Sequence, residues 1–340
     1  MNKLRRLFHH SSWRAMRRFW KRTRRIWTAV LMMAVVVLLV QLARDVEWRE
    51  VWSTLRKMPV AVLVESACLV PIAYLAYSSY DLLGRAYTGH KLRKLTTMMV
   101  AFVSYSANVN LGALVGGVGL RFRLYSKLGL RVSVISKVLA MSIFTNWLGY
   151  VFLFGVLFTL HEAPAEWRLS PWALRAAGLV MLALTAGYLA LCAFARRRHL
   201  HIAGRHIPLP TLRIAALQLV LSVICWGALG GILYLLFGRE VSYTLVLAAL
   251  LLSSIAGAIV HMPGGVGVLE AVFVAMLAHE VPKSQVLGTL LAYRALYYLG
   301  PLVIAMLMYA TLEARLRRQG GATARAAPAG AAGKSSGATG

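Results

Sequence analysis

Long apolar segments, separated by short charged connections, constrain this chain more than any other feature of its sequence. An apolar run of about 18 residues or more is long enough to cross a bilayer as a helix. The connections between the runs are too short to hold a soluble domain. The sequence therefore predicts an all-α polytopic membrane protein. About eight apolar segments fall at residues 26–43, 60–83, 96–117, 133–160, 171–195, 212–237, 243–278 and 285–312.

Composition supports this class and excludes others. Hydrophobic residues make up 59% of the chain and charged residues 14%, both outside the range typical of soluble domains. The net charge of +27 could indicate nucleic-acid binding. However, the basic residues fall in short blocks between apolar segments, which is the pattern that orients membrane helices. We expect no nucleic-acid partner.

No motif for catalysis or metal binding is present in the sequence. Cys68, Cys192 and Cys225 lie inside apolar segments without metal-ligand spacing, and we interpret them as packing residues. A P-loop, an H-E-x-x-H motif and a C-x-x-C motif are all missing from the sequence. We therefore expect neither an enzyme nor a bound cofactor or metal.

The distribution of Lys and Arg predicts the topology. The N-terminal arm, residues 1–25, is basic, and the connection at 84–95 carries bases and no acid, so both should be cytoplasmic. A basic stretch follows segment 96–117 as well, so both of its ends look cytoplasmic. By the same rule, both ends of segment 243–278 lie outside. The predicted fold has about six full spans plus two opposed Gly-interrupted re-entrant hairpins, with the N and C termini cytoplasmic. The predicted domains are the arm 1–25, a membrane domain 26–312 and a tail 313–340 that is basic and then disordered.

Both predicted hairpins carry the same interruption. The first reads "NVNLGALVGGVGLRFR" (108–123) and the second "AGAIVHMPGGVGVLEA" (256–271), each with G-G-V-G and a charged residue shortly after it. Similar glycine breaks in opposite halves of a transporter indicate an inverted repeat with a binding site at its interface. Close helix packing through small residues is the alternative interpretation.

Non-helical backbone survives at membrane depth only where protein or a water-filled cavity satisfies its polar groups. Pro263 should end one helix, and a new helix beginning near Gly265 would direct free N–H groups and a positive dipole end into the protein. Such helix ends bind phosphate. The predicted glycine and proline positions of this substrate-binding site are Gly116, Gly117, Gly119, Pro263, Gly264, Gly265 and Gly267.

Charged side chains within the apolar segments are functional candidates, because placing a charge at the bilayer centre costs about 2.5 kcal/mol or more. Arg294 either extends to the outer surface or faces inward, where it would pair with Glu270 or a phosphate. Tyr297 and Tyr298 lie on or near its helical face. Glu270 could cap a helix, receive a cationic head group or carry a proton.

Other polar residues have two interpretations each. Arg121 suits a phosphate contact from the cytoplasmic leaflet, or it is an ordinary positive-inside residue. Asp81 would meet Arg85, four residues along the same helix. Asn108 and Asn146, which are polar at depth, could be interhelical hydrogen-bonding residues.

The stretches "GGVGLRFRLY", "TNWLGY", "HMPGGVGVLE" and "AYRALYYLGP" together resemble the lysylphosphatidylglycerol synthetase transmembrane-region family, in particular its stand-alone YbhN-like inner-membrane proteins. In fused members of that family, this region is taken to flip an aminoacylated phospholipid that a separate cytosolic domain synthesises. The resemblance implies a bacterial inner-membrane protein and translocation without synthesis. The family pattern falls on Gly116, Gly117, Gly119, Arg121, Pro263, Gly264, Gly265, Gly267, Glu270, Arg294, Tyr297 and Tyr298.

We therefore expect a protein that moves a phospholipid with an anionic or aminoacylated head group between leaflets. In this scheme a polar cavity between the hairpins alternates in exposure. Two other functions remain open: an ion- or proton-coupled transporter of a small solute, and a non-transporting membrane partner of a lipid-synthesising enzyme. The expected partners are membrane phospholipids and, under the last alternative, that enzyme.

Overall fold

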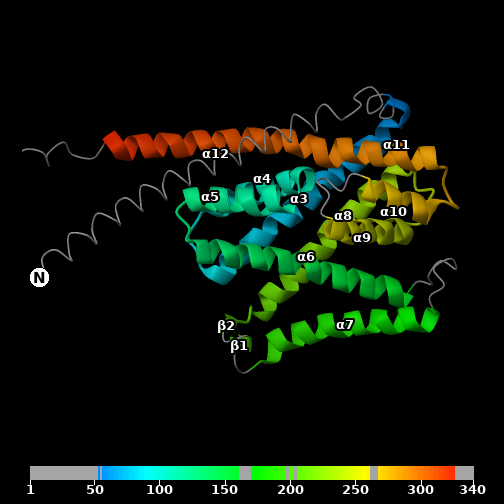
Figure 1. Cartoon of the computed structure of the whole chain (residues 1–340), viewed down its shortest axis with the longest axis horizontal. Coiled ribbons are helices and arrows are strands. Elements are labelled where there is room, and N and C mark those ends of the chain that lie inside the picture. The colour runs from blue at the N-terminus through cyan, green and yellow to red at the C-terminus, as the bar shows by residue number, and fades with distance from the viewer. Residues whose placement is uncertain are drawn as a thin grey trace, which may run out of the picture.

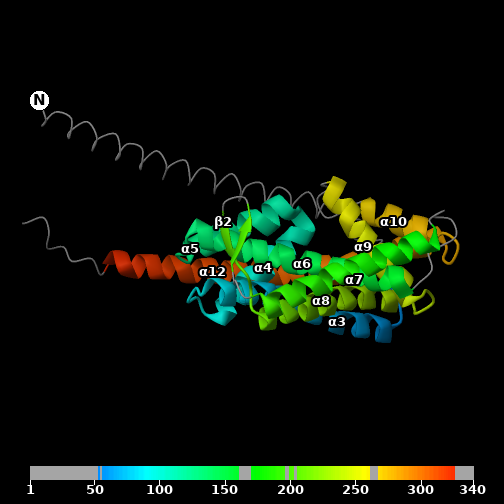
Figure 2. The same cartoon turned by 90° about the horizontal axis from the view of Figure 1, so that it is seen from below.

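Helices that run along one common axis make up most of the fold, as α6, α7 and α12 show in two perpendicular views (Figures 1 and 2). The computed structural model describes residues 53, 56–160, 170–195, 199–202, 205–260 and 267–325. The predicted arm 1–25 and the predicted span 26–43 lie outside the described residues. The elements are α3 (Val60–Thr88), α4 (Lys94–Leu111), η1 (Ala113–Leu120), α5 (Arg121–Lys127), α6 (Val132–Leu160), α7 (Pro171–Phe194), β1 (His199–Ile202), β2 (Arg205–Pro208), α8 (Leu212–Leu236), α9 (Tyr243–Val260), α10 (Val268–Leu277), α11 (Lys283–Tyr293), η4 (Arg294–Leu299) and α12 (Gly300–Arg325).

Six of the described helices are long and apolar enough to cross a membrane, which confirms the predicted all-α polytopic membrane class; the re-entrant hairpins and the orientation of the termini stay predictions. They are Val60–Thr88, Val132–Leu160, Pro171–Phe194, Leu212–Leu236, Tyr243–Val260 and Lys283–Ala314. All except Tyr243–Val260 coincide with predicted full spans. That segment was predicted to lie in a re-entrant hairpin, whereas by length and composition α9 alone could cross.

The first predicted hairpin folds as α4, a chain reversal and then η1 and α5 (Figure 1). The chain turns at Gly112, whose φ of 86° suits glycine best. The π-helix η1 packs back along α4, and a Cβ added to Gly116 would lie 2.2 Å from the carbonyl carbon of Ala107. At the open end, the Tyr125 hydroxyl lies 3.5 Å from the Thr97 carbonyl oxygen. Both ends of this hairpin therefore lie together; its depth in a bilayer stays a prediction.

The second hairpin, α9 followed by α10, lies in the other half of the molecule (Figure 1). Gln285 follows α10 and Glu240 precedes α9, yet the Gln285 amide donates to the Glu240 carboxylate at 2.8 Å. The open ends of the two hairpins thus face opposite ends of the molecule. The helix after the break begins at Val268, a few residues beyond the predicted start near Gly265.

The last span is interrupted by the π-helix η4 and continues to Arg325, beyond its predicted end at residue 312. The predicted C-terminal tail thus begins as helix. The interruption precedes Pro301, which has no N–H to bond the Tyr297 carbonyl four residues earlier. The Tyr74 hydroxyl donates to that carbonyl instead, at 3.1 Å. The backbone group released by the proline is therefore satisfied by a neighbouring helix.

Apolar side chains cover both the interior and much of the outer surface. Tyr74, Ile232 and Phe273 are fully buried in the central core, where α3 packs along α8. On α7, Leu179 and Leu184 remain 57% and 63% exposed, as expected of a helix that faces lipid.

One short antiparallel pair of strands departs from the all-helical prediction in the described part of the chain. β1 pairs with β2, and His201 lies opposite His206.

Candidate functional site

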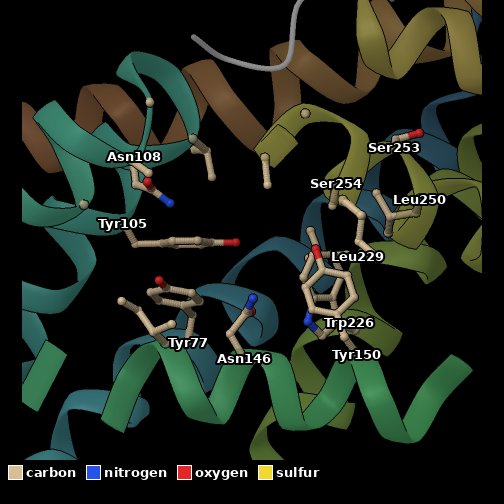
Figure 3. Close-up of a pocket in the computed structure, with 18 of the residues that line it drawn as sticks. Tyr77, Tyr105, Asn108, Asn146, Tyr150, Trp226, Leu229, Leu250, Ser253 and Ser254 are labelled. Atoms are coloured by element: carbon tan, nitrogen blue, oxygen red, sulfur yellow. The ribbon is translucent and has the colours of Figure 1, made fainter. Parts of the chain in front are cut away.

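A cavity of about 440 Å³ lies between the two hairpins (Figure 3). The first hairpin contributes Tyr105, Asn108 and Gly117 to its wall. The second contributes Ser253 and Leu269, and the remaining wall comes from α3, α6, α8, α11 and η4. The predicted cavity between the hairpins is therefore present, and it is large enough to hold a small polar group.

Polar side chains without protein partners face this cavity. Figure 3 shows the amides of Asn108, on α4, and Asn146, on α6, pointing into it. Neither amide hydrogen-bonds to another side chain or backbone group in the described part of the chain. The Asn108 Oδ1 atom lies against Gly117, where a Cβ would approach it to 2.9 Å, so its Nδ2 donor faces the cavity. The buried Nε1–H of Trp226 also lacks a hydrogen-bond partner. Unsatisfied donors in a cavity wall indicate that a ligand or water completes them.

Tyrosine rings form much of the remaining wall. The rings of Tyr77 and Tyr105 stack with centroids 3.5 Å apart, and those of Tyr293 and Tyr297 stack at 5.4 Å. The Tyr105 and Tyr297 hydroxyls share a hydrogen bond of 2.6 Å. This bond joins α4 of the first hairpin to η4.

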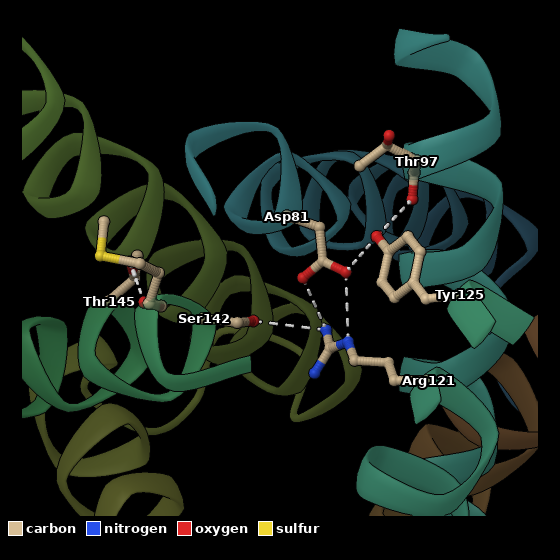
Figure 4. Close-up of polar contacts among 7 residues, drawn as sticks. Asp81, Thr97, Arg121, Tyr125, Ser142 and Thr145 are labelled. Carbon is tan, nitrogen blue, oxygen red and sulfur yellow. Dashed lines mark hydrogen bonds and ion pairs between the residues drawn. The ribbon is translucent and has the colours of Figure 1, made fainter. Parts of the chain in front are cut away.

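A buried ion pair borders the cavity (Figure 4). Arg121 Nη2 lies 3.1 Å from one Asp81 oxygen, and its Nε donates to the other at 3.2 Å. The Tyr125 hydroxyl donates to the same carboxylate at 2.8 Å, and Arg121 also donates to the Ser142 hydroxyl at 3.3 Å. The prediction that Asp81 meets Arg85 is wrong, because Arg85 donates instead to the Leu92 carbonyl at 2.7 Å. Arg121 lines the cavity, but its charge is already balanced by Asp81.

A second ion pair joins the second hairpin to η4. Arg294 Nη2 lies 2.8 Å from Glu270 Oε1, with side chains that are 20% and 24% exposed. The other Glu270 oxygen accepts the Gly267 N–H at 2.8 Å, in the first turn of α10. Two of the roles considered for Glu270, helix cap and partner of Arg294, therefore coexist. Arg294 faces inward rather than extending to the surface.

The π-helix η4 thus contacts both hairpins. Besides the Tyr105–Tyr297 bond, the Asn110 amide of α4 donates to the Tyr298 carbonyl at 3.2 Å. Arg294 connects η4 to the second hairpin through Glu270. π-Helical turns occur often at functional sites.

The structure separates the predicted site residues into groups. Those that line the cavity are Gly117, Arg121, Tyr297 and Tyr298. Gly116 serves close packing against α4, which was the alternative interpretation, and Gly119 lies in the same π-helix. Gly267, Glu270 and Arg294 form the neighbouring capped ion pair. Pro263, Gly264 and Gly265 lie outside the described residues.

Sequence reasoning missed the aromatic wall. Tyr77, Tyr105 and Trp226 carried no motif, and in an apolar helix an aromatic residue is usually a packing residue. The one available signal was the pair Asn108 and Asn146, polar residues deep in apolar segments. No group of three or more His, Cys, Asp or Glu side chains in the described part of the chain could hold a metal.

These observations define a class of protein: a polytopic α-helical membrane protein in which two opposed hairpins and an interrupted last helix enclose a partly polar cavity. Broken helices around a central cavity are a recurrent design of membrane transport proteins.

The chain belongs to the lysylphosphatidylglycerol synthase TM region family, because the model of that family matches residues 26–305. It is 45% identical to the inner membrane protein YbhN of Escherichia coli (strain K12) over 302 residues, which cover 88% of this chain and 95% of that relative. It is 30% identical to the protein slr0712 of Synechocystis sp. over 271 residues, covering 78% and 84% of the two chains. It is also 30% identical to the phosphatidylglycerol lysyltransferase of Staphylococcus haemolyticus over 87 residues, only 24% of this chain and 10% of that enzyme.

The comparisons confirm the family resemblance found in the sequence. Together with the six apolar helices, they identify a multi-pass bacterial inner-membrane protein. The matched residues are those of a membrane region, and a catalytic domain is not seen among the residues that the structure describes.

Proposed function

We propose that this protein moves phospholipids between the leaflets of the inner membrane through the central cavity, without synthesising them. The observation that carries the proposal is the cavity itself. Both hairpins line it, and the amides of Asn108 and Asn146, which have no protein partner in the described part of the chain, face it. Such groups are costly in a membrane protein unless they serve a polar ligand. A membrane protein meets polar groups attached to lipid in every head group of the bilayer.

The donors suit a phosphodiester. A phosphate group offers only acceptor oxygens, and the two amides supply donors. The cavity wall also contains Gly112 and Ala113, at the N-terminal end of η1, and helix N-termini favour anions. Arg121 and Arg294 are balanced by their carboxylate partners, so phosphate recognition would rest on neutral donors rather than on free cations.

The head group beyond the phosphate is proposed to be anionic or aminoacylated. This class follows from the matched relative that is a phosphatidylglycerol lysyltransferase, together with a cavity wall rich in tyrosine. Aromatic faces attract ammonium groups. A lipid-synthesising enzyme would then be the natural partner of this protein, as the source of the lipid.

Alternating exposure of the cavity would require the hairpins to move relative to η4. Glu270 and Arg294 hold the second hairpin to η4, so removing either charge should change the rate of movement. The Glu65–Arg239 pair, at 2.6 Å and about half exposed on both sides, supplies a matched control away from the cavity.

The test is a leaflet-exchange assay in reconstituted vesicles with labelled lipids of several head groups. Glu270→Gln and Arg294→Ala should slow exchange at least about tenfold, whereas Glu65→Gln should stay within about twofold of wild type. Well-folded wild-type protein that exchanges no lipid would refute the proposal. Activity that is independent of head group and collapses with the proton gradient would instead favour the coupled solute transporter.

A further inference from the structure

His90 has two buried ring nitrogens, and neither has a hydrogen-bond partner in the described part of the chain. It follows Gly89, which ends α3 with a φ of 68°, and lies in the short connection to α4. The Arg85 side chain donates to the Leu92 carbonyl at 2.7 Å, which holds this connection against the last turn of α3. A buried polar group is costly unless it is hydrogen-bonded, so packing alone does not explain a histidine here.

A series of contacts joins His90 to the cavity. Its ring meets the buried ring of Tyr125 on α5 at an angle of 60°, with the centroids 6.3 Å apart. The Tyr125 hydroxyl donates to Asp81 at 2.8 Å, and Asp81 pairs with Arg121, which lines the cavity (Figure 4). A change of charge at His90 would therefore act on the ion pair that borders the cavity.

The charged groups that act on His90 come from α3. Burial and the cation of Arg85 lower the pKa of His90 below its ordinary value of 6.5, and the Asp81 carboxylate opposes them. α5 presents the neutral ring of Tyr125. The bases of the connection and of the first turn of α4 are exposed: Lys91, Arg93 and Lys94. At neutral pH the buried imidazole is therefore uncharged.

A proton on His90 would change the balance of charge around Asp81. It would place a second cation beside the carboxylate, where the imidazolium competes with Arg121 for Asp81 and repels the Arg121 guanidinium. Because this conformation disfavours the charged ring, acid shifts the protein toward a conformation in which His90 is solvated. That shift requires the connection to move away from Tyr125, at the open end of the first hairpin.

We propose that His90 is a proton-binding site that controls the Asp81–Arg121 pair, so that a proton taken up on the predicted cytoplasmic side loosens the first hairpin at its open end. The inference rests on the proposed function and adds its regulation by pH. The proton binds a ring nitrogen from the adjacent water and returns to the same side, so no proton gradient is consumed.

The proton site is tested by histidine NMR of the full chain in lipid nanodiscs. The His90 signal is assigned by its loss in His90→Phe. The pKa of His90 should lie below 6.5, and Arg85→Gln should raise it, because a neighbouring cation disfavours the imidazolium. If His90 titrates at or above 6.5, or if its pKa does not respond to Arg85→Gln, the proposal is wrong.

Its effect on transport is tested by phospholipid exchange in vesicles with the same pH on both sides. As the pH falls from about 8 to about 5, exchange by wild type should rise at least about threefold. His90→Phe keeps a ring against Tyr125 but cannot bind a proton, so it should match wild type at the high end and show no rise. The matched control is His279→Phe, since His279 is an exposed histidine beside the second hairpin. It should keep the rise.

Thermal unfolding at the high end of the pH range checks that the variants fold, and His90→Gln replaces His90→Phe if the latter does not. A rise that is equal in wild type and in the folded His90 variant would overturn the proposal and leave the proposed function standing. Absence of exchange by well-folded wild type at every pH would refute the proposed function, and its regulation by His90 with it.

Discussion

Replacing Asp81 with alanine should destabilise the protein more than removal of any exposed charge. The Asp81 side chain is fully buried and holds Arg121 through two contacts of 3.1 and 3.2 Å. It also accepts the Tyr125 hydroxyl at 2.8 Å. Without the carboxylate, the buried guanidinium keeps the Ser142 hydroxyl at 3.3 Å and the Tyr77 ring at 5.7 Å, both neutral partners.

The expected magnitude follows from the burial of the pair. Removing one member of a buried ion pair costs about 3–5 kcal/mol, because the other charge is left uncompensated. The matched control is Glu65→Ala, whose pair with Arg239 is 46% and 57% exposed and should contribute about 1 kcal/mol or less. The measurement is the free energy of unfolding in mixed micelles, by denaturant titration.

A double variant separates the cost of a stranded charge from the value of the pair. Asp81→Leu combined with Arg121→Met removes both charges and should recover much of the stability lost in Asp81→Ala, since well-packed apolar residues often replace buried pairs at little cost. If Asp81→Ala proves as stable as Glu65→Ala, or if the double variant is no more stable than the single one, the reasoning fails.

Three further expectations concern the hairpin, the aromatic wall and a connecting loop. Gly116→Ala should destabilise the protein by at least about 1 kcal/mol because its Cβ would overlap α4, whereas Gly187→Ala, with open space around it, should be neutral or mildly stabilising in the same unfolding assay. Tyr105→Phe leaves the buried Tyr297 hydroxyl without its 2.6 Å partner and should cost about 1–3 kcal/mol; an unchanged unfolding midpoint would show that this bond is dispensable. Burial, together with the nearby charge of Arg85, lowers the pKa of His90 below its ordinary value of 6.5, so the neutral form is favoured in the folded state. The stability that His90 contributes is present above about pH 6.5 and is lost as the pH falls through the lowered pKa, and His90→Gln should flatten that part of the pH profile.

Contacts in the site could be predicted from the sequence where a rule about single residues applied, such as the cost of an unpaired charge in an apolar segment. The pairing of Glu270 with Arg294 was one predicted alternative, because two opposite charges deep in apolar segments are stable mainly when they meet. The pairing of Asp81 with Arg121 was missed. The nearest base along its helix is Arg85, and nothing local in the sequence shows that Arg121, at the start of α5, reaches Asp81 on α3.

The glycine motifs show the same limit. The sequence predicted breaks at both, and it left close packing open as an alternative. In the first hairpin, the turn falls at Gly112 and Gly116 contacts the backbone of α4. A glycine that permits a turn and a glycine that permits close approach look alike in sequence, because each is defined only by the absence of a side chain.

The amino-acid sequence by itself determined that this chain is a bundle of membrane helices with its breaks at two places. Apolar length and the cost of unpaired backbone in lipid act on each segment alone. Only the tertiary structure decided that Asn108, Asn146, Tyr105 and Trp226 share one cavity. These residues come from three helices far apart along the chain, and a cavity is a property of how helices pack rather than of any one of them.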